Sequence, residues 1–305
     1  MKKVINKILE LVQLSESFFL PKATSIQVST NEILKKGLND FNFTDEEVDS
    51  FWVNTIRKLV FFFNKNDSRL FLHCDAIKLT MFSNADYKEF SYLKRNAKWE
   101  TIKKSLVEDR LGNPKRYLFF LRSSPNLIHH AYSLHLGLEN IGVSIENISS
   151  VFEFGGGYGS FCRLLYKSKY RGSYTIYDLK IFSLIQQYFL SNVTHNKINF
   201  GSVQEDKETI NLIYNESKLL EANSQVDLIV GLWSFSETPY NLRDKIFNQI
   251  RANYYIIAYS HLFEEYNNIE YFKKMDQKLV NEGYRVINVE IGHLKGHSYF
   301  FAAKI

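Results

Sequence analysis

Four glycines crowd into five residues directly after an apolar segment. Gly155, Gly156, Gly157 and Gly159 follow residues 151–154, although the chain has only 14 glycines among 305 residues. Glycine lets the backbone turn sharply and lets a ligand approach amide N–H groups without a Cβ in the way. A strand that ends in such a loop and leads into a helix is typical of a nucleotide-binding turn.

The spacing of this loop separates the candidate ligands. A phosphate-binding loop would end in Gly-Lys-Ser/Thr, but this one continues through Tyr158 and Ser160 without a lysine. A dinucleotide fingerprint needs a glycine where Ser160 stands. The pattern that fits is Glu-x-Gly-x-Gly-x-Gly, from Glu153 to Gly159. A second carboxylate, Asp178, closes the next apolar segment, where it can accept hydrogen bonds from both hydroxyls of a ribose.

This combination resembles the first motif of class I S-adenosylmethionine-dependent methyltransferases. The resemblance implies that Glu153 lies near the cationic part of S-adenosyl-L-methionine, the glycines under its methionine portion, and Asp178 at its ribose. We expect further cofactor contacts from four residues near the ends of the predicted strands, although an aromatic side chain there is more often part of the core: Tyr158, Leu179, Gln204 and Trp233.

The second half of the chain alternates between strand-like and helical segments. Strands are predicted over 149–154, 173–178, 197–203, 226–233 and 253–260, and two more over 284–292 and 297–305. Alternating strands and helices indicate a mostly parallel sheet covered on both sides. The last two strands must be antiparallel because the link between them is short. With the resemblance, this predicts an α/β, Rossmann-like class I methyltransferase fold with a seven-stranded sheet and an antiparallel C-terminal strand pair.

The first part of the chain shows helical periodicity instead. Helices are predicted over 1–19, 44–64 and 97–107, and a stronger one begins at Pro125. We therefore divide the chain into a helical cap or oligomerisation region, 1–122, and a methyltransferase domain, 123–305. The helical region is expected to cover the strand ends, to contribute acceptor contacts and to offer a surface for a homodimer.

A closer resemblance covers roughly residues 123–240. The segments "SPNLIHH", "VFEFGGGYGSFCRLLY", "YTIYDL" and "DLIVGLWSFSE" resemble the sugar O-methyltransferase family found in bacterial surface-polysaccharide loci. The chain departs from that pattern at Lys180, where a proline usually follows Asp-Leu. The resemblance implies O-methylation of a sugar hydroxyl during capsule or O-antigen biosynthesis. The acceptor would be a nucleotide-, lipid- or polymer-linked sugar or glycan.

Methyl transfer to a hydroxyl depends mainly on positioning and on a base within hydrogen-bond reach. Glu237 follows the fourth predicted strand and His261 the fifth, so both are candidates for the base. Their alternatives are a helix-capping carboxylate and an exposed turn histidine. Three further histidines are candidates for substrate binding, with a solvated polar face as the alternative for the first two: His129, His130 and His297.

Composition narrows the remaining classes of function. A net charge of +5, interpreted as spread along the chain, suits an anionic small substrate or a weak approach to acidic surfaces but not nucleic acid. Two cysteines indicate neither a disulfide framework nor a metal centre, and no Asp/Glu/His cluster has metal-ligand spacing. The absence of a disulfide framework predicts a reducing, cytoplasmic setting, and no apolar run is long enough for stable membrane insertion.

Two alternatives to a sugar methyltransferase remain at this stage. One is methylation of a small metabolite or of a phosphate-type capsule group. The other is a non-catalytic methyltransferase-like partner of a glycosyltransferase, which the intact Glu153, glycines and Asp178 argue against.

Overall fold

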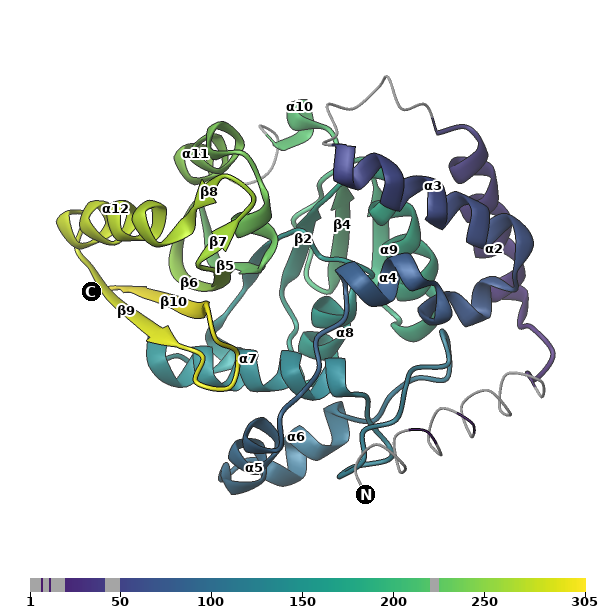
Figure 1. Ribbon diagram of the computed structural model, residues 1–305, viewed down its shortest axis with the longest axis horizontal. Helices are drawn as coiled ribbons and strands as arrows, with labels where there is room; N and C mark the ends of the chain where they lie inside the picture. Colours follow the sequence, from purple (N-terminus) through teal and green to yellow (C-terminus); the bar gives the residue numbers. More distant parts are fainter. Residues whose placement is uncertain (1–6, 8–10, 12–19, 42–49, 220–224) are drawn as a thin grey trace. The chain divides into compact units, whose positions relative to one another are not determined.

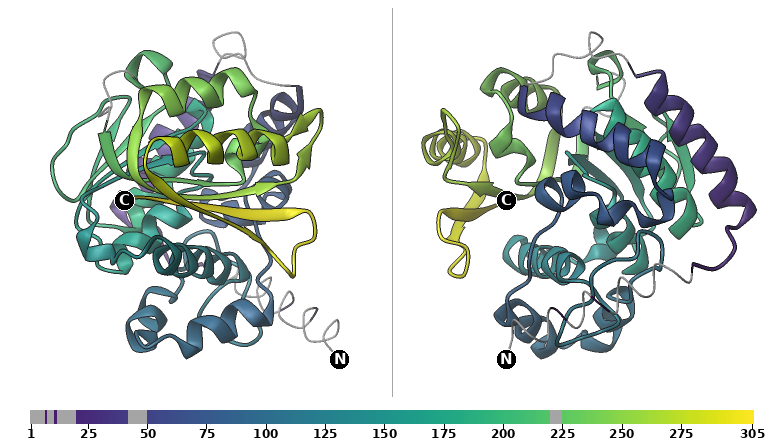
Figure 2. Two further views of the ribbon diagram at one scale, coloured as in Figure 1. Left: turned by 90° about the vertical axis from the view of Figure 1, so that its left-hand side faces the viewer. Right: turned by 45° about the vertical axis from the view of Figure 1, so that its right-hand side comes forward.

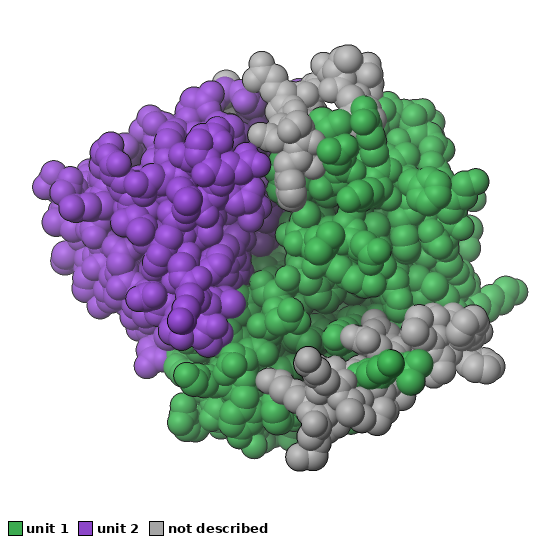
Figure 3. Space-filling view, in the orientation of Figure 1, with its two compact units in different colours: residues 1–132, 157–168, 179–195 green, residues 133–156, 169–178, 196–305 purple. Residues whose placement is uncertain are grey.

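The computed structural model describes residues 7, 11, 20–41, 50–219 and 225–305 (Figure 1). The chain forms two compact units, coloured separately in Figure 3. Unit 1 contains residues 1–132, 157–168 and 179–195, and unit 2 contains residues 133–156, 169–178 and 196–305. The helix predicted at 1–19 lies almost entirely outside the described residues, as does the start of the helix predicted at 44–64.

Unit 2 is built on an eight-stranded sheet with the order β3-β4-β2-β1-β5-β6-β10-β9. Neighbours from β3 to β6 are parallel, and β10 is antiparallel to both β6 and β9. The strands are β1 (Ser150–Phe154), β2 (Ser173–Tyr177), β3 (Lys197–Phe200), β4 (Thr209–Ile213), β5 (Gln225–Leu232), β6 (Arg251–Ser260), β9 (Tyr284–Glu290) and β10 (His297–Lys304). The mostly parallel sheet with an antiparallel C-terminal pair is thus confirmed.

The prediction of seven strands was wrong by one. The strand predicted at 197–203 ends at Phe200, and a further strand, β4, follows after residues 201–208. Parallel neighbours usually need a crossover of a dozen or more residues, which is why this pair was not expected. Asn211 of β4 stabilises the short link, because its side chain accepts from the Gln204 N–H at 3.0 Å and donates to the Gln204 carbonyl at 2.9 Å.

One face of the sheet packs against α11 (Tyr240–Gln249) and α12 (Asn268–Asn281) (Figure 2). Phe247 of α11 and Phe272 and Met275 of α12 join one buried cluster with strand residues such as Ile229 and Phe300. The other face meets the second half of α7 (Pro125–Ile141), where Gly137 lies so close to Ile256 that a Cβ would clash. The remaining regular elements described in unit 2 are short. They are η2 (Ile145–Asn147), α10 (Glu216–Leu219), η3 (Ser234–Glu237), β7 (Leu262–Phe263) and β8 (Tyr266–Asn267).

Unit 1 is helical. Its elements are α2 (Ser25–Asn39), α3 (Ser50–Lys65), η1 (Ser68–His73), α4 (Asp75–Thr80), α5 (Tyr87–Arg95), α6 (Trp99–Ser105), the first half of α7, α8 (Ser160–Lys167) and α9 (Lys180–Val193). α2 packs along α9, and α6 packs against α8. The N-terminal region is therefore mainly helical, as predicted, and it packs against the helices that follow β1 and β2 in the sequence. The boundary at 122/123 stays a prediction. None of the described helices is long and apolar enough to cross a membrane.

Candidate functional site

The carboxyl ends of β1, β2 and β5 bring together the residues that the sequence singles out in unit 2. These strands are parallel neighbours, so the residues that follow them lie at one edge of the sheet. Ligands of open α/β sheets bind at such an edge. Glu153, Gly155, Asp178 and the 234–237 turn belong to it.

Glu153 is a buried carboxyl group near the end of β1, with 3% of its surface exposed. The Tyr174 hydroxyl donates a hydrogen bond to its Oε2 at 2.9 Å. The pKa of Glu153 is raised to about 8, mainly by burial; the hydrogen bond from Tyr174 opposes this rise and the charge of Asp178 adds to it. A cation bound at this edge would favour the ionised form of Glu153.

The first glycine of the loop is required by the protein's own packing. Gly155 has φ +69°, and a Cβ there would lie 2.3 Å from the Ser234 Cβ. Ser234 in turn donates a hydrogen bond to the Phe154 carbonyl, so the end of β1 and the turn after β5 hold each other. Gly155 alone is therefore no evidence for a ligand.

Gly157 differs from Gly155 because a Cβ there would not clash with the protein. The three atoms nearest to a Cβ there all belong to the Met81 side chain, at 3.5–3.8 Å, an ordinary contact distance, yet φ is +57°. The positive φ, rather than a clash with a neighbouring side chain, therefore disfavours other residues at this position. Met81 follows α4, so one residue of the helical N-terminal region lies beside Gly157 within unit 1.

Asp178 and Leu179 follow β2 directly and are partly exposed. The Asp178 N–H donates to the Ile213 carbonyl at 3.1 Å, which fixes its backbone beside the end of β4. Leu179 is the residue before α9. The carboxylate thus has the strand-end position that ribose binding requires.

Glu237 ends the short helix η3 (Ser234–Glu237) after β5. It is partly exposed, and burial of its carboxyl group raises its pKa to about 7. Phe235 anchors the turn by stacking against Phe154 and Phe247, both with ring centroids 4.6 Å away. A carboxyl group that titrates near neutrality can accept a proton far better than an ordinary glutamate.

Arg243 of α11 fixes the backbone on both sides of Glu237. Its fully buried guanidinium donates to the Ser236 carbonyl at 3.1 Å and to the Thr238 carbonyl at 2.5 Å. It also donates to the Asn268 side chain at 2.6 Å, and Asn268 itself donates to the Ser236 carbonyl. Three tyrosine rings lie 4.9–5.3 Å from the guanidinium: Tyr240, Tyr266 and Tyr271. No sequence motif pointed to Arg243.

Trp233 and His297 form a hydrogen-bonded pair in unit 2. The Trp233 Nε1–H donates to the His297 Nδ1 at 2.9 Å. An indole can only donate, so neutral His297 carries its proton on Nε2. Trp233 has φ +68°, which costs a non-glycine residue roughly 1–2 kcal/mol. Strain of this kind is found at functional sites.

His261 follows β6 and is partly exposed. Its Nε2 lies 2.9 Å from the Ser298 hydroxyl, and its backbone N–H donates to the Gly296 carbonyl at 2.7 Å. β6 is the parallel neighbour of β5, so His261 and Glu237 follow adjacent strand ends, as predicted.

Gln204 does not lie at the strand end where it was predicted. Its side chain accepts from the Nζ of Lys197, the first residue of β3, at 2.6 Å. Because of the additional strand, the link that contains Gln204 returns toward the amino ends of β3 and β4. Tyr214 and Asn215, which follow β4, occupy the strand-end position expected of Gln204.

The Tyr158 ring is likewise not available for the predicted cofactor contact. It is 3% exposed, packs against Phe71, Phe82 and Phe189, and its hydroxyl accepts from Asn126 at 3.1 Å. The side chain is thus part of the core of unit 1, which was the alternative interpretation, and only its backbone belongs to the loop.

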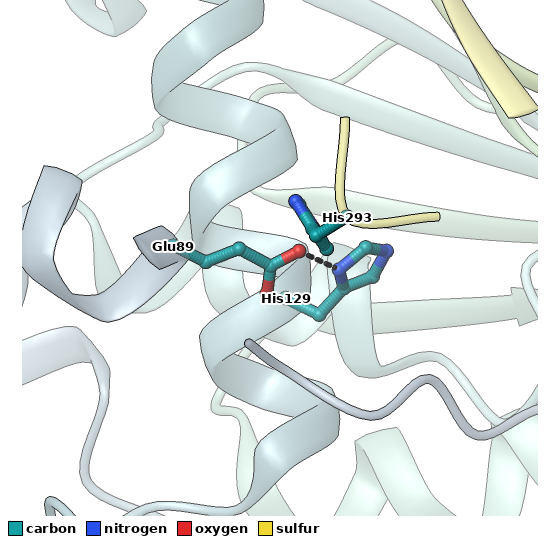
Figure 4. A group of neighbouring side chains, drawn as sticks. All are labelled: Glu89, His129 and His293. Carbon is teal, nitrogen blue, oxygen red and sulfur yellow. Dashed lines mark hydrogen bonds and ion pairs between the residues drawn. The ribbon is translucent and has the colours of Figure 1, made fainter. Parts of the chain in front are cut away.

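His129 is fully buried, and Figure 4 shows its Nδ1 directed at Glu89, 2.7 Å from Oε1. The alternative that His129 lies on a solvated polar face is therefore wrong. The pair of Glu89 and His129 links α5 to α7. Glu89 and His129 are of types that bind metals, but 40 residues separate them and no motif links them. Burial, and then His129, lowers the pKa of neighbouring His130 to about 3, so that His130 is neutral.

Comparisons with known proteins give no family for this chain. No family model and no curated protein matches it. Among solved structures, the 16S rRNA methylase ArmA shares 12% identity at a TM-score of 0.37, over 71% of this chain and 91% of that one. The methyltransferase domain of bacterial CtHen1-C shares 14% at 0.43, over 59% and 98%. An O-methyltransferase family protein from Burkholderia thailandensis shares 8% at 0.35, over 58% of each chain. At these TM-scores the likeness says nothing about what this chain acts on.

Proposed function

We propose that this protein is an S-adenosylmethionine-dependent O-methyltransferase that acts on a sugar hydroxyl in bacterial surface-polysaccharide biosynthesis. The observation that carries the proposal is the arrangement of Glu153, the glycine loop and Asp178 after two adjacent parallel strands. The sugar acceptor rests on the sequence resemblance over residues 123–240 alone.

The residues of this edge fit the cofactor. Glu153 supplies a carboxyl group for a sulfonium cation, Gly157 supplies approachable backbone, and Asp178 supplies a carboxylate for ribose hydroxyls. When bound, S-adenosylmethionine supplies an activated methyl group. The chain's own part in the reaction is to orient the acceptor hydroxyl and to accept its proton, and Glu237 is suited to that role because its pKa is raised to about 7.

Binding of the cofactor and of its demethylated product can be measured by calorimetry with two matched variants. Gly157→Val places a branched side chain in the space above the loop and should abolish binding. Gly283→Val is the control, because Gly283 also has positive φ, +86°, but a Cβ there meets nothing within 4 Å. Retained binding in folded Gly157→Val protein would refute the cofactor site.

The acceptor is tested separately. Mass spectrometry of surface glycans from cells with and without the gene should show the loss of one methyl group per modified site. Restoring the gene with Asp178→Ala should restore less of the methyl group than restoring the unaltered gene. Unchanged glycans in the deletion strain would refute the sugar acceptor while leaving the cofactor site intact.

A further inference from the structure

The basic residues of unit 1 are concentrated in one segment. Residues 88–122 contain ten Lys and Arg against four Asp and Glu, whereas the whole chain has a net charge of only +5. The interpretation of the positive charge as spread along the chain was therefore wrong. The segment comprises α5, α6 and the connection to α7, and α5 packs against α6 (Figure 1).

Most acidic residues of this segment form hydrogen bonds or ion pairs with other residues of unit 1. Glu89 is buried against His129, Glu108 accepts from the Ser124 hydroxyl at 2.5 Å, and Asp109 pairs with Arg163 at 2.7 Å. Seven basic residues are exposed and form no ion pair within the described part of the chain: Lys88, Lys94, Arg95, Lys98, Lys104, Arg110 and Arg122. The surface of the segment is thus strongly positive.

An apolar turn lies within this basic segment. In the sequence "KRYLFFLR", residues 115–122, the Phe120 N–H donates to the Tyr117 carbonyl at 3.0 Å, and the Tyr117 N–H donates to the Ser123 carbonyl at 2.8 Å. These bonds close a tight turn, which we call the 115–122 turn. Phe119 and Leu121 are 45% and 55% exposed, although both are large and apolar.

The interior of the turn holds its outer residues in place. Phe120 stacks on Phe90 of α5 with ring centroids 6.1 Å apart, and Tyr117 is buried. Phe119 instead packs beside the exposed ring of Tyr87, at 4.8 Å. The 115–122 turn therefore presents Phe119 and Leu121 outward from an anchored base, with Lys115, Arg116 and Arg122 on either side in the sequence.

We propose that the 115–122 turn, with the exposed basic residues of α5 and α6, is a docking surface for an anionic lipid bilayer. Apolar side chains enter the boundary between headgroups and acyl chains, and Lys and Arg are attracted to anionic lipids. Tyr87 adds an amphipathic ring of the kind enriched at membrane interfaces. Leu121 favours a bilayer over a polynucleotide, because an aliphatic side chain cannot stack on a base as an aromatic ring does.

The test is co-sedimentation of the full chain with vesicles, which requires neither cofactor nor acceptor and is independent of the proposed function. We expect binding to vesicles of phosphatidylcholine with phosphatidylglycerol, and at least about tenfold weaker binding to phosphatidylcholine alone. Raised salt should weaken binding to the anionic vesicles. Equal binding to the neutral vesicles, or no binding to the anionic ones, overturns the proposal.

Two double variants locate the surface. Phe119→Ser with Leu121→Ser should reduce binding at least about tenfold. Phe61→Ser with Leu79→Ser is the matched control, because these residues are even more exposed, at 67% and 78%, but lie outside the 88–122 segment. Circular dichroism establishes that both variants are folded. If the control variant loses vesicle binding equally, the bilayer does not dock on this surface. Binding of a single-stranded RNA oligonucleotide is measured for the same variants. If Phe119→Ser with Leu121→Ser loses affinity only for the RNA, the bilayer is not the partner.

Discussion

Tyr174 of β2 donates its hydroxyl hydrogen bond to the buried carboxyl group of Glu153 on the neighbouring strand β1. The bond favours the ionised carboxylate, whereas burial opposes ionisation and prevails, because the pKa is raised to about 8. Protonation of Glu153 is therefore coupled to whatever cation binds at this edge of the sheet.

Affinity for S-adenosylmethionine should rise with pH and level off above about pH 8, because only ionised Glu153 attracts the sulfonium. The rise is at most about tenfold per pH unit for one linked proton. Calorimetry in buffers of different ionisation enthalpy measures the proton released on binding. Glu153→Gln should flatten the profile, and Tyr174→Phe should move the plateau to higher pH. A flat wild-type profile would contradict the coupling.

The same carboxyl group affects folding with the opposite dependence on pH. The pKa of Glu153 is raised in the folded chain, so the folded chain binds this proton more tightly than the unfolded chain does. The contribution of Glu153 to stability is complete below its ordinary pKa of 4.5 and is lost as pH rises through about 8. Urea unfolding across this range should show a smaller loss in Glu153→Gln protein than in the wild type.

Asp178→Ala should weaken binding of the cofactor and of its demethylated product about equally, by about 10- to 100-fold. The ribose is common to both ligands, and a hydrogen bond to a charged group contributes about 1.5–3 kcal/mol. Glu153→Gln, in contrast, should weaken only the cofactor, because the product lacks the sulfonium charge. A change below about twofold for Asp178→Ala would mean that another residue holds the ribose.

Glu237→Gln should lower kcat by about 10²–10⁴-fold while cofactor affinity hardly changes. In the wild type, kcat should rise as pH passes about 7, because the base form of Glu237 exists above its pKa. His261→Ala is the rival variant. If it alone abolishes turnover, His261 is the base. If both variants remain active, no base is needed at these two strand ends.

Arg243→Lys should lower kcat about tenfold or more, because lysine cannot hold the carbonyls on both sides of Glu237 at once. Arg163→Lys is the matched control: Arg163 is equally buried and binds the Ser105 and Val107 carbonyls, away from the η3 turn. Both variants should lose about 1–3 kcal/mol of stability in urea unfolding. If both variants lose kcat equally, Arg243 stabilises the fold in general and does not specifically position Glu237.

The sequence was sufficient for features that depend on local pattern. The alternation of strand and helix and the short link before 297 predicted the parallel sheet and its antiparallel end, because these follow from connection length. Glu153, Asp178 and Glu237 were placed correctly near strand ends, because Glu153 is the second-last residue of β1, Asp178 directly follows β2 and Glu237 ends the short helix after β5.

Features that depend on tertiary packing could not be predicted in this way. The link 201–208 is too short to predict a parallel strand after it, and it is held by hydrogen bonds with Asn211. Because β4 was not predicted, Gln204 was assigned to the wrong position. The burial of Tyr158 depends on aromatic residues of α9 and of the first 82 residues, far from it in sequence. The pairing of Glu89 with His129 and the contacts of Arg243 likewise arise only in the folded chain.

The hydrogen bond from Trp233 to His297 gives the protein an intrinsic optical reporter. The chain has three tryptophans, and only Trp233 follows a central strand of the sheet. Both ring nitrogens of a protonated histidine are donors, so protonation of His297 would remove the acceptor of this bond and place a positive charge beside the indole. Fluorescence emission will therefore respond to the charge on His297, without any label attached to the chain.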